Sequence, residues 1–111
     1  AEGFSAEAAS DLEAELGESD IVSSATISQT PLVRGALLKA GAHVDLVGGF
    51  TPDMREADDD AIRRARVFVD TRAGATKEAG DIVKPLASGV LCTAIASPQH
   101  NYRIFGFYHL Q

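Results

Sequence analysis

The chain has 111 residues and a formal net charge of -6, and 45% of its residues are apolar against 23% charged. This balance is typical of one small folded domain and argues against an intrinsically disordered segment. The ten basic residues form no stripe, and no apolar run approaches the roughly 20 residues that span a bilayer, so we expect neither a nucleic-acid partner nor a membrane partner.

The first predicted elements are a short helix and a strand. Ser10-Asp11-Leu12-Glu13 has the capping-box pattern, in which the Ser and Glu side chains bond the free amides of a helix start. Leu12 and Leu16 follow at helical spacing, and Gly17 suits the helix end. Residues 20–26, DIVSSAT, are rich in β-forming residues and predict the first strand.

The next stretch predicts a turn, a second helix and a second strand. Residues 29–31 have the composition of a turn, and residues 32–40 predict a short helix that Gly41 closes. His43 to Val47 predict the second strand, and residues 51–53 predict a further turn.

A third helix and strand follow. Asp58-Asp59-Asp60 places anionic side chains where they favour a helix N-terminus, and residues 66–70, RVFVD, predict the third strand. Thr71 then caps a weaker helix that continues through Ala79, and Gly80 ends it.

The alternation of strands and helices predicts an α/β fold. The strands are nearly continuous apolar runs, which is typical of buried parallel strands joined by crossover helices. Three strands make a poor sheet by themselves, so we expect half of a larger parallel sheet. The last ten residues depart from this pattern and hold four of the seven aromatic residues (Tyr102, Phe105, Phe107 and Tyr108). We interpret them as a β-hairpin, a docking strand or an oligomer contact.

The residues that follow the strands are the most informative about function, because ligands of such sheets bind at the carboxyl ends of the strands. These ends are residues 24–28, which offer hydroxyl groups, residues 48–52, which begin with two glycines, and residues 70–71. Two glycines let the backbone approach a flat ring or a phosphate, although they also form ordinary turns.

We predict no metal site, because three consecutive acids at a helix start do not point at one centre and no Cys or His pair has metal-ligand spacing. Asp53, Arg55 and Glu56 have two interpretations, a substrate-binding cluster or a network that fixes the loop, and we favour the second. The single cysteine, Cys92, precludes an internal disulfide, and the N-terminus has no leader pattern, so we expect a cytoplasmic protein.

Residues 41–83 resemble the ornithine cyclodeaminase/mu-crystallin family. The resemblance is carried by GAHV, by VGGFTPDMREADD and by VDTRAGATKEAGD, and with the preceding SDIVSSATISQTPLVRGALLKAG it extends from Asp11 to Leu91. It implies a dimeric enzyme that uses NAD or NADP and acts on an amino acid or a cyclic imino acid. The implied fold for residues 1–91 is the second half of a Rossmann-like NAD(P)-binding domain with a parallel sheet.

The resemblance also implies a set of site residues. Thr26 and Ile27, after the first strand, would touch the cofactor, Val47 would pack against the nicotinamide, and Phe50 would face the substrate. Members that deaminate ornithine have an Asp where this chain has Phe50, and a phenyl ring cannot accept a proton. The family's ketimine reductases tolerate a non-acidic residue there. We therefore favour reduction of a Δ1-pyrroline-2-carboxylate type imine, with ornithine cyclodeamination as the alternative.

Several parts expected of a complete enzyme do not occur in this chain. It has no glycine-rich phosphate turn of the G-x-G-x-x-G type. The family's substrate-binding Arg and its proton-donating Lys lie upstream of the matched portion, so we assign no catalytic residue. Residues 92–111 form a divergent tail, where the family has a helix with an F-K-S pattern that Ile104 to Phe107 matches only faintly. A further alternative is therefore a catalytically inactive remnant that binds a partner through this tail.

Overall fold

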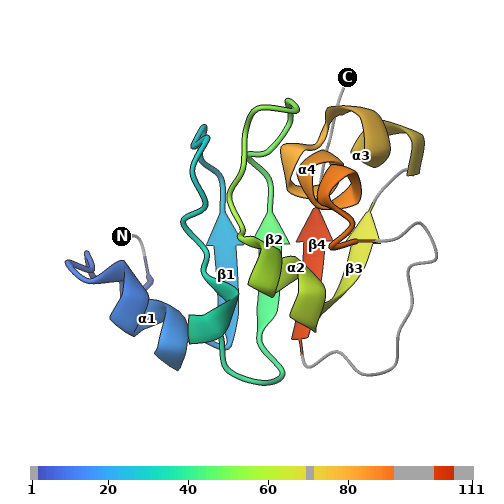
Figure 1. Cartoon of the computed structure of the whole chain (residues 1–111). Helices are drawn as coiled ribbons and strands as arrows, with labels where there is room; N and C mark the ends of the chain where they lie inside the picture. Colours follow the sequence, from blue (N-terminus) through green and yellow to red (C-terminus); the bar gives the residue numbers. More distant parts are fainter. Residues whose placement is uncertain (1–2, 70–71, 92–101, 107–111) are drawn as a thin grey trace.

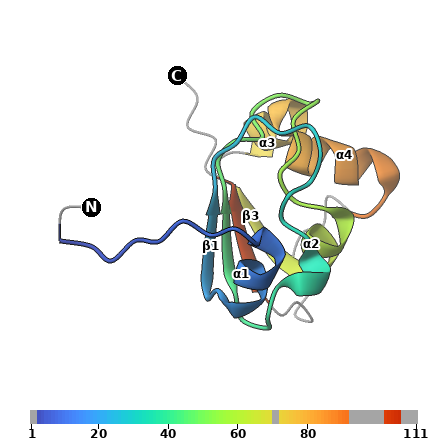
Figure 2. The same ribbon diagram turned by 90° about the vertical axis from the view of Figure 1, so that its left-hand side faces the viewer.

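The computed structural model describes residues 3–69, 72–91 and 102–106 as a four-stranded parallel sheet with helices on one face (Figures 1 and 2). Side chains are described for all of these residues except Arg72 and residues 102–106. In chain order the elements are α1 (Leu12–Glu18), β1 (Ile21–Ser24), the 3-10 helix η1 (Gly35–Leu37), β2 (His43–Leu46), α2 (Asp59–Arg64), β3 (Ala65–Val69), α3 (Arg72–Glu78), α4 (Gly80–Ser88) and β4 (Tyr102–Gly106).

All four strands run in the same direction, in the order β1-β2-β4-β3. This arrangement confirms the predicted α/β class and its parallel sheet. Within the described residues, no helix has both the length and the apolar character needed to cross a bilayer.

The alternation of side chains along the strands places the core on one face of the sheet. Val44 and Leu46 of β2 are buried, whereas His43 and Asp45 on the opposite face are half-buried. Figure 2 shows α2, α3 and α4 on the same side of the sheet. Their apolar side chains, among them Ile62 of α2, join the strand residues in a single hydrophobic cluster. Burial of each such side chain contributes about 1.5–3 kcal/mol to the stability of the fold.

The first helix begins one residue later than the capping-box pattern predicts. Asp11 is the N-cap, and its carboxylate accepts a hydrogen bond from the Ala14 amide at 3.1 Å. A negatively charged cap is favoured over the neutral Ser10 at the positive end of a helix. The helix continues past Gly17 and ends at Glu18.

The helix predicted over residues 32–40 is wrong except for its centre, where η1 forms a single turn. The Leu32 and Val33 amides both donate to the Glu56 carbonyl oxygen, at 2.9 and 2.8 Å, and Val33 forms a parallel bridge with Ala57. These bonds hold the backbone extended just where the helix was expected to start. Gly41 adopts a φ of 82°, in agreement with its predicted role in ending this segment.

Gly80 begins a helix instead of ending one. A Cβ at this position would overlap the Met54 carbonyl oxygen, and its amide donates to the carbonyl oxygens of Gly49 and Thr51, both at 3.1 Å. The glycine is therefore required because the start of α4 packs directly on the backbone of the loop after β2. The sequence pattern did not predict α4, which contains Pro85.

The fourth strand corrects the interpretation of the C-terminal residues. Tyr102–Gly106 lies between β2 and β3 and pairs with both in parallel, so this segment belongs to the sheet instead of departing from it. Of the three interpretations of this tail, a docking strand describes Tyr102–Gly106 best, because β2 and β3 leave one position between them and β4 occupies it. The remaining aromatic residues, Phe107 and Tyr108, lie outside the described residues.

Candidate functional site

The carboxyl ends of β1 and β2 lie side by side at one edge of the sheet (Figure 1). The two strands pair in parallel with Ser24 opposite Leu46, and the Val47 amide donates to the Ser24 carbonyl oxygen at 2.8 Å. The segments that leave these strands, residues 25–28 and 47–53, therefore start from adjacent points. We refer to them as the β1 tip and the β2 tip.

The buried carboxylate of Glu56 accepts hydrogen bonds from both tips. Its side chain is 0% exposed, and its Oε1 accepts hydrogen bonds from the Ser24 hydroxyl at 2.8 Å and from the Thr26 amide at 2.6 Å. Its Oε2 accepts from the Gly48 amide at 2.7 Å. The carboxylate thus satisfies one donor at the end of β1, one donor of the β1 tip and one donor of the β2 tip, which compensates its loss of hydration on burial.

Gly48 is required by the close approach of the two tips. A Cβ on Gly48 would lie inside the contact distance of the Thr26 carbonyl oxygen and 2.5 Å from the Glu56 Oε1 atom. Protein backbone therefore fills the space that this glycine opens. Of the two interpretations of the glycine pair, these contacts of Gly48 agree with an ordinary structural role.

The residues expected to contact a cofactor and a substrate lie on these two tips. Ile27 is 76% exposed, Phe50 is 43% exposed and Val47 is 38% exposed, so apolar side chains of both tips face solvent. Thr26 is half-buried, and its Oγ1 accepts from the Ser28 amide at 3.2 Å. The structure thus places the four predicted residues on two segments that leave neighbouring strands.

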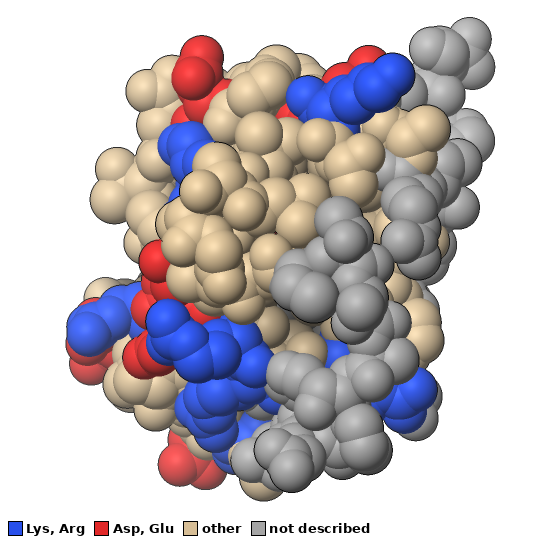
Figure 3. All heavy atoms as spheres, turned by 45° about the vertical axis from the view of Figure 1, so that its right-hand side comes forward, with Lys and Arg blue, Asp and Glu red and all other residues tan. Residues whose placement is uncertain are grey.

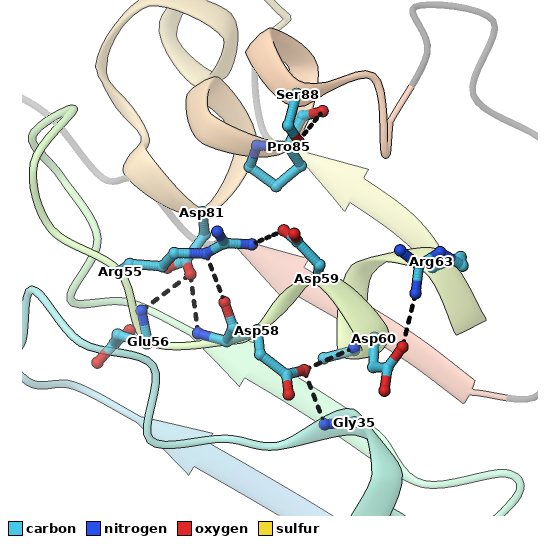
Figure 4. Close-up of polar contacts among 12 residues, drawn as sticks. Gly35, Arg55, Glu56, Asp58, Asp59, Asp60, Arg63, Asp81, Pro85 and Ser88 are labelled. Atoms are coloured by element: carbon cyan, nitrogen blue, oxygen red, sulfur yellow. Dashed lines mark hydrogen bonds and ion pairs between the residues drawn. The ribbon is translucent and has the colours of Figure 1, made fainter.

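A second buried carboxylate, Asp81 of α4, lies next to Glu56 (Figure 4). Its Oδ1 accepts from the backbone amides of Glu56 and Ala57, both at 2.9 Å, whereas its Oδ2 has no hydrogen-bond partner among the described residues. Burial raises the pKa of Asp81 to about 6, and the two amide hydrogen bonds oppose this rise. Asp81 was not among the predicted site residues, because it lies in the helix that the sequence pattern did not predict. The acid directly after Gly80, in the family string, was the available signal.

Arg55 and Glu56 belong to a network that fixes the loop, as the second interpretation of the sequence proposed. The Arg55 Nε donates to the Ala57 carbonyl oxygen at 2.8 Å, its guanidinium forms an ion pair with Asp59, and its amide donates to the Ser28 carbonyl oxygen at 2.7 Å. Asp53 is exposed on the same loop. Glu56 is fully buried by these contacts, and the Arg55 side chain bonds its own loop and α2.

The acidic run at the start of α2 is also used within the fold. The Asp58 Oδ1 accepts from the Ala61 and Gly35 amides, both at 2.9 Å, so Asp58 caps α2 and binds η1 to it. Asp60 pairs with Arg63 at 2.6 Å. On the surface seen in Figure 3, acidic and basic side chains lie next to one another. Among the residues that the structure describes, no group of three His, Cys, Asp or Glu side chains is arranged to hold a metal ion.

Comparison with known proteins shows which family this chain belongs to. The model of the ornithine cyclodeaminase/mu-crystallin family matches residues 1–101. The Δ1-pyrroline-2-carboxylate reductase of Paracoccus denitrificans is 49% identical over 84 residues, which cover 76% of this chain and 27% of that protein. The ketimine reductase mu-crystallin of Mus musculus is 41% identical over 64 residues, which cover 58% of this chain and 20% of that protein.

Among solved structures, the Thermococcus litoralis Δ1-pyrroline-2-carboxylate reductase in complex with NADH and L-proline matches with a TM-score of 0.74. The two chains are 26% identical, and the match covers 85% of this chain and 34% of that one. This chain spans about a quarter of the length of the curated relatives that it matches. The matched share is 27% of the Paracoccus denitrificans protein and 20% of the Mus musculus protein. On the family match, this chain belongs to the ornithine cyclodeaminase/mu-crystallin family.

Proposed function

We propose that this chain is the second half of the Rossmann-like NAD(P)-binding domain of a larger oxidoreductase, which reduces a cyclic imine of the Δ1-pyrroline-2-carboxylate type to a cyclic amino acid. The observation that carries the proposal is the parallel pairing of β1 with β2, which brings the two tips to the same carboxyl edge of the sheet, where nucleotides bind in such folds. Membership of a family that includes imine reductases supports the substrate class.

In this proposal the tips form one wall of the nicotinamide site. Thr26 and Ile27 of the β1 tip and Val47 of the β2 tip contact the nicotinamide end of NAD or NADP, and their exposed apolar atoms fit a planar ring. When bound, the reduced nucleotide supplies the hydride for the C=N bond. The residues of this chain bind and orient that end of the nucleotide and exclude water from it.

Phe50 faces the substrate in this proposal and favours reduction over deamination. Reduction of an imine adds a hydride to carbon and a proton to nitrogen, and it needs no base at position 50. Cyclodeamination of ornithine releases ammonia and needs a group that accepts protons, which a phenyl ring cannot do. The proposal assigns the proton donor for the reduction to the part of the larger protein that lies outside this chain.

The proposal includes a larger, dimeric protein. Residues 1–91 together with Tyr102–Gly106 supply one part of the nucleotide domain, and the phosphate-binding turn and the substrate-binding residues belong to the remainder. Light scattering on the full-length protein should give the mass of a homodimer. A monomer that retains full activity would contradict this part of the proposal.

The activity is tested by supplying Δ1-pyrroline-2-carboxylate with NADH or NADPH to the full-length protein and following the loss of nucleotide absorbance. We expect turnover with at least one of the two nucleotides. A parallel assay supplies L-ornithine with NAD and measures ammonia release. Clear ammonia release without imine reduction would replace the proposed reaction with cyclodeamination.

A further inference from the structure

We propose that Glu56 is a positioning residue for the nicotinamide end of the nucleotide, because its carboxylate sets the spacing between the β1 and β2 tips. The inference rests on the proposed function and deepens it. Glu56 itself is fully buried and does not touch the nucleotide.

The atoms that Glu56 holds are immediate neighbours of the residues that contact the ring. On the β1 tip, Glu56 binds the amide of Thr26, and the exposed Ile27 follows directly. On the β2 tip it binds the amide of Gly48, which lies between Val47 and Phe50. The Phe50 amide in turn donates to the Gly48 carbonyl oxygen at 2.9 Å. A shift of the carboxylate therefore moves both tips, which together form this wall of the nicotinamide site.

The chemistry of a carboxylate is required here. Its two oxygens only accept hydrogen bonds, and they receive three donors, two of which are backbone amides that cannot act as acceptors. A Gln side chain could keep its oxygen toward Ser24 and Thr26, but its NH2 group would then face the Gly48 amide, donor against donor. The link to the β2 tip would be lost while the link to the β1 tip remained.

Glu56 is itself held rigidly. Its amide donates to the Asp81 Oδ1 at 2.9 Å, and its carbonyl oxygen accepts from the amides of Leu32 and Val33. These bonds attach it to the start of α4 on one side and to the segment before η1 on the other. Because its backbone is fixed, the geometry of its side chain is transmitted to the tips.

The test compares two ligands of the full-length protein. NADH contains the nicotinamide ring, whereas ADP-ribose has only the rest of the molecule. For Glu56→Gln we expect the Kd for NADH to rise about tenfold, as for the loss of one charge-assisted hydrogen bond, and the Kd for ADP-ribose to stay within about twofold of the wild-type value. Glu78→Gln, at an exposed carboxylate, is the matched control and should change neither value.

A milder variant covers the case in which Glu56→Gln does not fold. Ser24→Ala removes one of the three donors and keeps the carboxylate, so we expect the Kd for NADH to rise about threefold with little change for ADP-ribose. If a folded variant binds both ligands equally more weakly, or binds both with unchanged Kd, the positioning role is overturned and the proposed function remains intact. A wild-type protein that binds neither ligand would overturn the proposed function together with this inference.

Discussion

Two neighbouring buried carboxylates differ in the hydrogen bonds that they accept. Glu56 lies between the strand tips, and Asp81 lies at the start of α4. Both are 0% exposed. Glu56 receives three donors spread over both oxygens, and these donors come from two different segments. Asp81 receives two donors on one oxygen, both from the same segment, and its other oxygen has no described partner. Glu56 therefore connects the β1 and β2 sides through its two oxygens, whereas Asp81 binds one segment through a single oxygen.

The largest test of this comparison is Gly48→Ala. The added methyl group would press on the Thr26 carbonyl oxygen and on Glu56, so the tips must separate. We expect the free energy of unfolding, measured in urea, to fall by about 4 kcal/mol. Gly41→Ala is the control, because Gly41 has a φ of 82° but open space around its Cα, and it should lose only about 1 kcal/mol. Equal losses at both glycines would contradict the close approach described here.

The second test exchanges each acid for its amide at pH 7. Glu56→Gln leaves the Gly48 amide without an acceptor, and we expect the free energy of unfolding to fall by about 3 kcal/mol. Asp81→Asn keeps the acceptor for the two amides and removes a buried charge, so we expect the free energy of unfolding to rise, by up to about 3 kcal/mol. Urea unfolding of both variants checks the difference. Similar losses in the two variants would remove the distinction between the carboxylates.

The third test uses pH. The pKa of Asp81 is about 6 in the folded protein against 3.8 as its ordinary value, so the folded state binds this proton more tightly than the unfolded state does. The resulting stabilisation is fully present below about pH 4 and is lost as the pH rises through 6, and its total is about 3 kcal/mol. We therefore expect Asp81→Asn to gain stability relative to wild type between pH 4 and pH 7. A difference that stays constant over this range would contradict the assignment.

The smallest expected effect concerns the proposed contact between Phe50 of the β2 tip and the substrate. Phe50→Asp places a negative charge beside the substrate, which carries a carboxylate of its own in the proposed reaction. We expect kcat/KM for imine reduction in the full-length protein to fall about tenfold, which corresponds to about 1.4 kcal/mol. Phe50→Leu keeps an apolar side chain and should stay within about threefold. Unchanged kinetics in Phe50→Asp would place Phe50 away from the substrate.

The sequence predicted those elements that depend on local pattern. The apolar runs at β1, β2 and β3 and the acidic start of α2 needed no tertiary information, and their positions were predicted to within two residues at the ends the structure describes. The helix over residues 32–40 failed because Glu56 and Ala57, more than twenty residues away, hold that backbone extended. The start of α4 was not predicted for a similar reason. Gly80 has the pattern of a helix end, and only its contact with Met54 explains why a glycine begins a helix there.

The candidate site was predicted only in part. The rule that ligands bind at strand ends pointed to the correct segments, and the resemblance supplied Thr26, Ile27, Val47 and Phe50. The support beneath them was not predictable in detail, because nothing in the string of residues 53–56 shows that Glu56 turns inward to reach Gly48. Hydrogen bonds between segments far apart in the chain are set by the fold, and the local sequence carries no direct signal of them.

The position of β4 has a consequence for how the protein acquires its fold. The strand that separates β2 from β3 is the last of the four along the chain, so the gap between them stays open on the ribosome until residues 102–106 have emerged. Pairing of this kind joins residues distant in sequence and is therefore slow to form. A stop codon placed shortly before residue 102 would leave β3 without the strand it pairs with and would expose two strand edges to other nascent chains.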